Sequence, residues 1–459
     1  MKPLRHVLGS LLCAVVIIGL IGLVIGLPPL QAAPRPHIVF ILADDLGYAD
    51  VGFMGSREIQ TPHLDKLAAG GVVLESFYVQ PVCSPTRAAL LTGRYPTRTG
   101  VYTVVRPNAP WGLPLNERTL ADALREAGYH TAICGKWHLG EYQEAYRPTR
   151  RGFDEQYGHY FGALDYFTKL RNGRRDWYRN DQPCADEGYS THLLAQEAVR
   201  IIKERPQNKP LFLYVPFQAV HAPYQVPESY LEPYRHLEGN RQKYAGMVTA
   251  MDEAIGKIVA ALEECGMRQD TLIVFSSDNG GPSPGRITDN RPLRAGKGTI
   301  YEGGVRVYAL ANWPGRLPAG RRTSEPIHIV DWYPTLLKLA GAPLEQPLPV
   351  DGLDIWPVLA EGARSPHDAI LLCQSPSRAA VRSGDWKLIV NRAQNEIPGG
   401  STTARSRATA NRATTELYNL AIDISETNNL ASQEPDRVAQ LQQKLAAFLK
   451  DAVKPGNEQ

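Results

Sequence analysis

Short apolar runs alternate with amphipathic segments along most of this chain, and this alternation is the strongest constraint on its fold. Each run is rich in β-branched or aromatic residues and ends at a polar or glycine-containing loop, as buried strands of a parallel sheet do. The predicted strands are His37–Leu42, Thr131–Cys134, Pro210–Phe217 and Leu272–Phe275. The helices predicted between them are Thr61–Gly70, Leu120–Gly128, Ser190–Arg205 and Tyr244–Cys265. We therefore expect an α/β fold with a large, doubly wound, mostly parallel sheet flanked by helices.

The polar residues that follow these strands carry groups suited to catalysis or metal binding. Asp44 and Asp45 follow the first strand directly. An Asp pair is often only a turn or a helix cap, but burying two adjacent carboxylates is costly unless a cation neutralises them. Open α/β sheets bind ligands beyond the carboxyl ends of their strands, so we expect the strand-end residues to meet there. The other strand-end residues are Lys136, His138, His221, Asp278 and Asn279.

The oxygen-bearing members of this set indicate which metal they would bind. Asp44, Asp45, Asp278 and Asn279 offer carboxylate and amide oxygens, and the chain has no cysteine–histidine cluster of the kind that binds zinc. Hard oxygen ligands favour Ca²⁺ or Mg²⁺. We expect Ca²⁺, because it tolerates several carboxylates in irregular geometry, with Mg²⁺ as the alternative.

Cys83 begins a predicted helix within the run VCSPTRAALLTGRYPTRTG. Pro85 suits the first helical turn, and Gly93 ends the helix. A helix start attracts anions, and Arg87 lies one turn further along the same face. A lone cysteine in such a place is more often a small buried residue. A small nucleophile, a guanidinium and a helix N-terminus at one spot nevertheless favour a site for anion chemistry.

The segment Cys83-Ser84-Pro85-Thr86-Arg87, followed by Thr92, Gly93 and Arg94, resembles the signature of the type I sulfatase family, in which the cysteine is oxidised to formylglycine. The resemblance runs from about Pro36 to the C-terminus and implies an alkaline-phosphatase-like fold. Within the family, the chain is most similar to the arylsulfatase B type, which acts on N-acetylgalactosamine 4-sulfate. The segments that carry this narrower likeness are Ala43–Gly52, Pro148–Phe153, His221–Tyr234, Tyr244–Glu253 and Ile300–Arg306.

The resemblance implies a role for the residues already described and adds Lys297, which lies in the basic loop Arg291–Gly304. The implied metal ligands are Asp44, Asp45, Cys83, Asp278 and Asn279. The implied catalytic residues are Cys83, Arg87, Lys136, His138, His221 and Lys297. Of these, the residues that also bind the substrate are Lys136, His221 and Lys297.

The family mechanism then implies a sequence of steps. One hydroxyl of the hydrated formylglycine at position 83 attacks sulfur, while the cation and the basic side chains stabilise the developing charge. His221, assisted by Lys297, protonates the leaving alcohol. His138 takes a proton from the second hydroxyl, which expels sulfate and restores the aldehyde. We therefore expect a sulfatase that hydrolyses sulfate esters, and a formylglycine-generating enzyme as its partner during maturation.

The N-terminal segment predicts export from the cytoplasm. A basic start, an apolar stretch from Val7 to Leu27 and the small residues Ala32 and Ala33 are typical of a secretory signal over residues 1–33. The stretch is also near the length of a membrane span, so an uncleaved anchor is the alternative. We expect a periplasmic or secreted protein if the source is bacterial. A catalytic domain is predicted for residues 34–366, and a small antiparallel sheet with a terminal helix for residues 367–459.

Composition excludes one class of partner and leaves other questions open. A formal net charge of +3 gives no reason to expect nucleic-acid binding. Six cysteines without metal-type spacing leave room for one disulfide in an oxidising compartment, with the pairing open.

Two other functions compete with the sulfatase. One is a hydrolase of the same fold that acts on phosphate or phosphonate esters, and the other is a non-catalytic binder of sulfated glycans. A binder would be marked by a missing ligand or nucleophile, and none is missing here. Sulfated galactosamine glycans are the first expected substrate, followed by sulfated algal galactans and aryl sulfates. We expect the loops at residues 102–112, 160–185 and 286–294 to decide among them.

Overall fold

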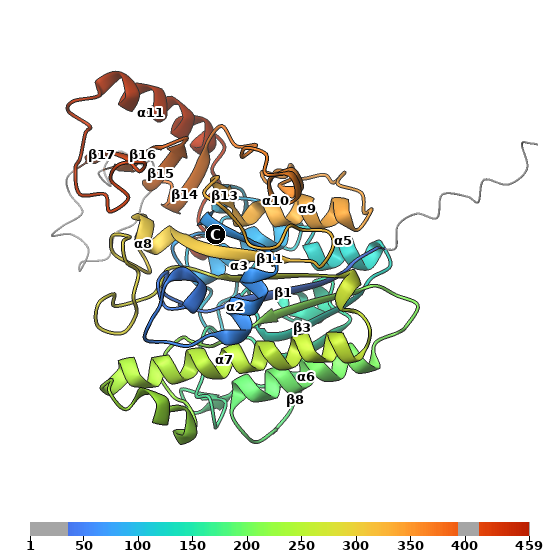
Figure 1. Cartoon of the computed structure of the whole chain (residues 1–459). Helices are drawn as coiled ribbons and strands as arrows, with labels where there is room; N and C mark the ends of the chain where they lie inside the picture. Colours follow the sequence, from blue (N-terminus) through green and yellow to red (C-terminus); the bar gives the residue numbers. More distant parts are fainter. Residues whose placement is uncertain (1–34, 393–412, 459) are drawn as a thin grey trace, which may run out of the picture. The chain divides into compact units, whose positions relative to one another are not determined.

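The computed structural model describes residues 35–392 and 413–458 (Figure 1). The signal predicted for residues 1–33 lies outside the described residues. From Pro36 onward the chain forms one compact unit. No helix in the described ranges is both long enough and apolar enough to cross a membrane.

An 11-stranded mixed sheet forms the centre of the molecule, in the order β12-β2-β11-β10-β1-β9-β3-β4-β7-β8, with β13 paired to β2. Its central strands are β1 (His37–Ala43), β3 (His130–Lys136), β4 (Glu155–His159), β9 (Leu211–Pro216) and β10 (Thr271–Ser277). These five are parallel to their neighbours within the group. The outer strands are β2 (Val72–Tyr78), β11 (Arg306–Asn312), β12 (Arg321–Thr323), β13 (Ile327–His328), β7 (Tyr178–Arg179) and β8 (Gln182–Pro183). The predicted mostly parallel sheet is confirmed.

Helices cover both faces of the sheet, as Figure 1 shows. Successive side chains of a strand point to opposite faces, so β1 sends Ile38 and Phe40 into one apolar core and Val39 and Ile41 into the other. The first core is closed by α3 (Cys83–Thr92), α5 (Leu120–Glu126), α9 (Trp332–Leu339) and α10 (Trp356–Glu361). The second is closed by α2 (Pro62–Ala69), α6 (Ser190–Glu204) and α7 (Gly239–Glu264). The doubly wound arrangement is thus confirmed.

A separate four-stranded antiparallel sheet follows, as predicted. Its strands are β14 (Ile370–Ser375), β15 (Arg378–Ser383), β16 (Trp386–Asn391) and β17 (Thr414–Asn419). The helix α11 (Pro435–Leu449) packs on it through Leu441 and Leu445, which join the apolar core beside α3. The boundary predicted near residue 366 stays a prediction, because this sheet belongs to the same compact unit as the large one.

Short elements complete the described structure. The remaining α-helices are α4 (Pro96–Thr99) and α8 (Glu302–Val305), and a hairpin pairs β5 (Leu170–Arg171) with β6 (Arg174–Arg175). The 3₁₀ turns are Gly52–Met54, Glu144–Tyr146, Pro148–Arg150, Glu228–Tyr230, Glu232–Tyr234, Arg268–Asp270, Ile329–Asp331 and Gly456–Glu458.

Two local expectations differ from the structure. The sequence from His328 to Ala340 also predicts a helix, but α9 begins only at Trp332, because His328 lies in β13 and forms a reciprocal capping box with Asp331. Residues 160–185 mix aromatic and basic residues without a clear period and predict an irregular segment, but they contain two short hairpins, β5–β6 and β7–β8. The five cysteines of the described residues are all free, so no disulfide forms among them.

Candidate functional site

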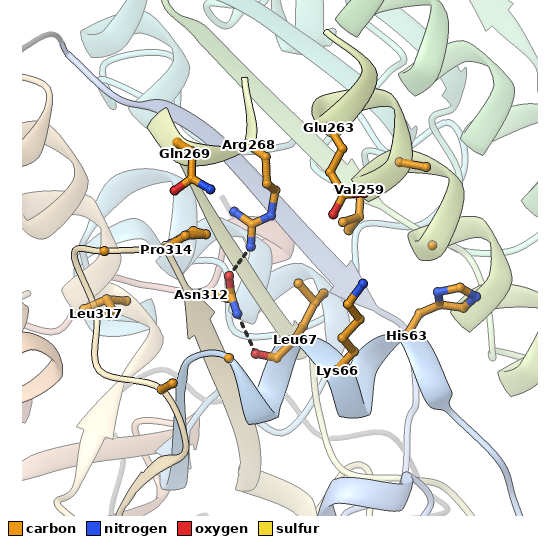
Figure 2. Close-up of a pocket in the computed structure, with 15 residues that line it drawn as sticks. His63, Lys66, Leu67, Val259, Glu263, Arg268, Gln269, Asn312, Pro314 and Leu317 are labelled. Carbon is orange, nitrogen blue, oxygen red and sulfur yellow. Dashed lines mark hydrogen bonds between the residues drawn. The ribbon is translucent and has the colours of Figure 1, made fainter. Parts of the chain in front are cut away.

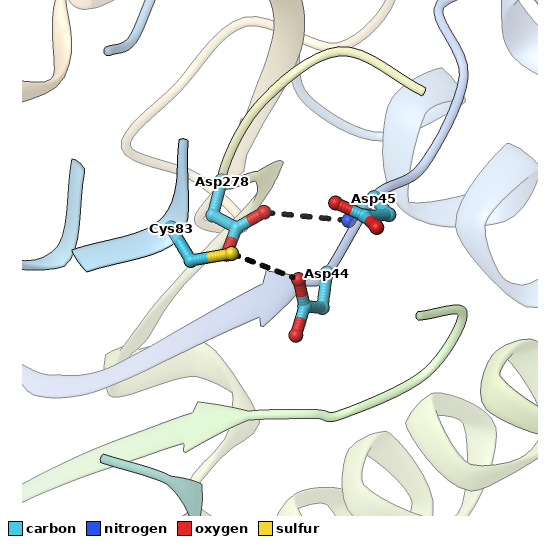
Figure 3. Close-up of side chains that lie close together, drawn as sticks. All are labelled: Asp44, Asp45, Cys83 and Asp278. Atoms are coloured by element: carbon cyan, nitrogen blue, oxygen red, sulfur yellow. Dashed lines mark hydrogen bonds between the residues drawn. The ribbon is translucent and has the colours of Figure 1, made fainter. Parts of the chain in front are cut away.

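Four predicted residues converge at the carboxyl edge of the large sheet (Figure 3). Asp44 and Asp45 follow β1, Asp278 follows β10, and Cys83 opens α3. One ligand atom from each of the four lies within 4.8 Å of the others, and all four residues are buried. The Sγ of Cys83 lies 3.6 Å from Oδ1 of Asp44, and the backbone N–H of Asp45 donates to Oδ1 of Asp278 over 3.3 Å.

Asn279 supports a metal at this cluster. Its Nδ2 donates to Oδ1 of Asp45 over 2.7 Å and to the carbonyl of Gly280 over 3.0 Å. These bonds leave its Oδ1 buried and without a hydrogen-bond partner among the described residues. An orphaned amide oxygen beside three buried carboxylates fits a hard cation such as Ca²⁺ or Mg²⁺.

Two lysine side chains form ion pairs with the carboxylates. Lys136 Nζ lies 2.5 Å from Oδ2 of Asp44, and Lys297 Nζ lies 2.6 Å from Oδ1 of Asp45. Burial alone would raise the pKa values of both Asp44 and Asp45. The charge of Lys136 nevertheless holds the pKa of Asp44 below its ordinary value, and the charge of Lys297 does the same for Asp45. Both carboxylates are therefore ionised at neutral pH.

Arg87 connects three parts of the site from one turn inside α3. Its side chain is completely buried, and its Nη2 donates to Oδ2 of Asp278 over 2.8 Å. Its Nη1 donates to the carbonyl of Lys136 over 3.0 Å, and its Nη2 lies 3.7 Å from Oδ2 of Asp44. Burial would lower the pKa of this guanidinium, but the Asp278 charge more than offsets it and keeps the group protonated. Arg87 therefore fixes the strand ends of β3 and β10 to the helix.

The two histidines differ in their surroundings. His138 is buried, and burial together with the nearby Lys136 charge lowers its pKa well below the ordinary value, so its ring is neutral. The Nδ1 of His221 lies 2.5 Å from the carbonyl of Ala222, which only accepts, so Nδ1 carries a proton. Its Nε2 lies 3.6 Å from Oδ2 of Asp45.

The thiol of Cys83 is held in its neutral form. Burial raises its pKa to about 12, although the charges of Lys136 and Lys297 act in the opposite direction. The encoded cysteine is therefore not a thiolate at neutral pH, since nucleophilic cysteines need a lowered pKa.

The site opens into a cavity of about 430 Å³. Its inner wall contains Cys83, His138, His221 and Lys297. Its outer wall comes from two of the three loops expected to decide the substrate and consists of Val104, Val105, Arg106, Pro107, Asn108, Gly162, Arg171 and Asn172. The third loop, at residues 286–294, lines a separate hollow with Glu58 and Arg241 instead.

Several residues that help to form the site escaped sequence reasoning. The Oγ of Ser84 donates to the carbonyl of His138 over 2.7 Å and accepts from the N–H of Val105 over 3.1 Å. The Oη of Tyr166 lies 2.8 Å from the carbonyl of His221. Arg171 reaches the cavity from the β5–β6 hairpin, whose only sequence signal was its Asn-Gly turn.

A larger hollow of about 540 Å³ lies elsewhere and contains none of the predicted site residues (Figure 2). Its wall includes Arg268, just before β10, whereas Asp278 lies just after that strand. Arg268 donates to Oδ1 of Asn312, and Nδ2 of Asn312 donates to the carbonyl of Leu67 over 2.7 Å. Size alone therefore does not mark the site, because the titratable groups gather around the smaller cavity.

Comparison with known proteins gives a consistent family. A model of the family described as Sulfatase matches residues 36–342. Arylsulfatase J of Mus musculus is 39% identical over 91% of this chain and 76% of its own length. N-acetylgalactosamine-6-sulfatase of Canis lupus familiaris is 36% identical over 79% of this chain and 73% of its own length. The crystal structure of Ps i-CgsB in complex with k-i-k-neocarrahexaose superposes with a TM-score of 0.82 at 34% identity, over 92% of this chain and 94% of the other.

Two narrower expectations receive less support. The relatives reported above do not single out a 4-sulfatase, since one of them is named for the 6-sulfate of N-acetylgalactosamine. The phosphonate monoester hydrolase of Agrobacterium radiobacter superposes with a TM-score of 0.65 at 21% identity, over 91% of this chain and 96% of the other. At that identity the likeness extends to the fold alone.

Proposed function

This chain belongs to the sulfatase family and is a sulfuric ester hydrolase, and from that premise we propose that it cleaves sulfate esters of glycans with a formylglycine formed from Cys83. One observation carries the proposal. Cys83 lies beside three buried carboxylates, with ligand atoms within 4.8 Å of one another, and it also faces the cavity that contains two histidines and Lys297. A buried cation site and an open pocket meet at this residue.

The metal in this proposal is Ca²⁺, with Mg²⁺ as the alternative. Asp44, Asp45, Asp278 and Asn279 would hold it, together with the side chain at position 83. When bound, the cation supplies Lewis acidity toward a sulfate oxygen. The orphaned Oδ1 of Asn279 and the ionised carboxylates support this assignment.

The basic residues of the chain bind and orient the sulfate group. The ammonium group of Lys136 is paired with Asp44, and that of Lys297 is paired with Asp45. Fixed cations of this kind stabilise negative charge that grows on oxygen during the reaction. Arg87 fixes the positions of Asp278 and the β3 end, so it preserves the geometry of the cation site.

The histidines move protons in this proposal. His221 lines the cavity and gives a proton to the departing alcohol oxygen, with Lys297 beside it. His138 is neutral at pH 7 and is suited to accept a proton from the hydrated aldehyde at position 83.

The substrate class is part of the proposal. A solved relative contains k-i-k-neocarrahexaose, and a curated relative is named for N-acetylgalactosamine, which supports a sulfated glycan. N-acetylgalactosamine 4-sulfate remains one candidate within this class. We further propose that the protein is exported and that a formylglycine-generating enzyme converts Cys83 before or during export.

Peptide mass spectrometry of protein from its native host tests the nucleophile. Conversion of Cys83 to formylglycine lowers the peptide mass by about 18 Da, because a thiol is replaced by an aldehyde. The same preparation should hydrolyse p-nitrophenyl sulfate faster than p-nitrophenyl phosphate, and a Cys83→Ala variant should hydrolyse neither. An unmodified cysteine in a host that contains the modifying enzyme would overturn the formylglycine assignment. Faster turnover of the phosphate would favour the phosphoesterase alternative.

A further inference from the structure

We propose that Arg106 and Arg171 form a second anion-binding subsite at the mouth of the cavity, which recognises a sulfate or carboxylate of the substrate other than the ester being cleaved. This inference rests on the proposed function, because it concerns the same cavity and the same substrate. Both arginines line the cavity together with Cys83, His221 and Lys297.

The hairpin that carries Arg171 places like charges opposite each other. Asn172 and Gly173 have φ values of 51° and 77°, as a two-residue type I′ turn requires, and Arg171 pairs in register with Arg174. Like charges directly across a hairpin are destabilising. A local arrangement that opposes folding in this way is expected where it serves binding.

No carboxylate within the described residues forms an ion pair with these arginines at 4.0 Å or less. Among the described residues, the guanidinium of Arg171 donates only to the carbonyl of Ala163, over 3.0 Å. The nearby carboxylates have other partners. Asp176 accepts backbone N–H bonds from Tyr160 and Phe161, and Glu141 accepts one from Asn108. Arg106 is exposed, and its guanidinium has neither a hydrogen bond nor an ion pair within the described part of the chain. Only its backbone carbonyl is bonded, to the N–H of Ala109 over 3.0 Å.

The loop that carries Arg106 and the hairpin that carries Arg171 contact each other, and both arginines line the same cavity. Nη1 of Arg174 donates to Oδ1 of Asn108 over 2.6 Å, and its guanidinium lies 5.8 Å from the ring centre of Phe161. This contact connects the β5–β6 hairpin to the loop that carries Arg106. Arg174 is therefore a positioning residue, while Arg106 and Arg171 remain available for a ligand.

The inner and outer cations differ in what they already bind. Lys136, Lys297 and Arg87 are paired with the carboxylates of the cation site. Neither outer guanidinium forms an ion pair of 4.0 Å or less with a carboxylate of the described residues, and a planar guanidinium matches both sulfate and carboxylate oxygens. The geometry therefore favours a glycan that carries at least two anionic groups, such as a polysulfated or uronate-containing chain, over a singly charged ester.

Matched oligosaccharides test the subsite. Three disaccharides share one scissile sulfate ester, and their second sugar is neutral, sulfated or carboxylated. The values of kcat/KM are measured for the wild type, for Arg171→Gln, for the double variant that combines Arg106→Gln with Arg171→Gln, and for Arg175→Gln. Arg175 is a matched control, because it lies exposed on the same hairpin and does not line the cavity.

We expect the wild type to prefer a dianionic disaccharide over the neutral one by about tenfold or more. The double variant should lose most of this preference, and Arg175→Gln should keep it. The sulfated and carboxylated disaccharides show which group the subsite prefers. A wild type without preference, or a double variant that retains it, overturns the subsite.

A separate readout distinguishes this inference from the proposed function. Failure to hydrolyse p-nitrophenyl sulfate with formylglycine present would contradict the function, whatever the arginines do. Calorimetric binding of the same disaccharides to a Cys83→Ala protein then tests the subsite without turnover. We expect the same order of affinities as of kcat/KM, and equal affinities for neutral and dianionic ligands would reject the subsite.

Discussion

At the scale of a single residue, His221 is the proposed proton donor, and the size of its contribution should depend on the substrate. Its Nδ1 is occupied by the carbonyl of Ala222, so only Nε2 is free to act on a ligand in the cavity. A proton donor matters most when the departing alcohol is a weak acid, as sugar hydroxyls are, and least for a nitrophenol.

His221→Ala should therefore lower kcat/KM for a glycan sulfate by about 10²–10⁴ but lower that for p-nitrophenyl sulfate by less than about tenfold. Steady-state kinetics on both substrates provide the measurement. His63→Ala is the control, because His63 lies at the other hollow, and it should change neither value. Equal losses on both substrates would refute the proton-donor role.

At the scale of elements, the start of α3 holds two segments of the site. Ser84 connects the carbonyl of His138 to the N–H of Val105 through one hydroxyl, whereas Thr92 at the far end of the helix bonds only near its own turn, to the carbonyl of Ala88 and the N–H of Arg94. Both hydroxyls are buried, so their removal allows a fair comparison.

Ser84→Ala and Thr92→Ala should each destabilise the fold by about 1–3 kcal/mol, because a buried hydrogen-bonding group is lost. Only Ser84→Ala should also change kcat/KM, since only that hydroxyl positions His138 and the loop at residues 104–108. Urea unfolding and kinetics on the same preparations measure both effects. Parallel losses of activity in the two variants would mean that the helix acts only through stability.

A buried charge cluster joins the small sheet to the loop of Lys297. Glu302 accepts from Nζ of Lys387 on β16 over 2.8 Å and from the hydroxyl of Tyr78 on β2 over 2.7 Å. Lys387 also lies 2.8 Å from Oε1 of Glu426. Burial alone would raise the pKa of Glu302, but Lys387 and Arg306 lower it to about 2. Because the folded pKa lies below the ordinary 4.5, its contribution to stability is present above pH 4.5 and is lost as pH falls through about 2.

Glu302→Gln should cost about 3–5 kcal/mol of unfolding free energy at pH 7, because it leaves buried cations only partly compensated. The difference in unfolding free energy between the variant and the wild type should shrink as pH falls below about 4.5. Denaturant unfolding at several pH values measures this difference. Lys444→Gln removes an exposed ion pair between α11 and Asp368, which lies just before β14, and should cost less than about 1 kcal/mol. A pH-independent difference would contradict the ionised role of Glu302.

The elements differ in how far the sequence specifies them. Each buried strand has its own apolar run and ends at its own polar residues, so the strands and the helices between them follow from local sequence patterns. The convergence of Asp44, Lys136 and Asp278 follows from one further rule, that ligands bind at the carboxyl edge of such a sheet. The antiparallel direction of β11 does not, because an apolar run is the same in both directions. Two of the loops predicted to contact the substrate do form the outer wall of the cavity, but the contact that joins them was not predictable, since Arg174 and Asn108 lie far apart in the chain.

At the scale of the whole molecule, the proposed cation site should couple cation binding to folding. Its ligands follow β1 and β10 and open α3, which are separate in sequence and meet only in the folded chain. An ion that binds there stabilises the native state and not the unfolded one.

After treatment with EDTA, adding Ca²⁺ to 100 times its Kd should raise the unfolding free energy by about 2.7 kcal/mol, measured by denaturant titration. Asp45→Asn should lose most of that gain, because it removes one carboxylate charge at nearly constant size. If the increase in unfolding free energy does not saturate with Ca²⁺, or is equal in Asp45→Asn, the ion binds elsewhere. A larger increase with Mg²⁺ than with Ca²⁺ would reverse the choice of metal.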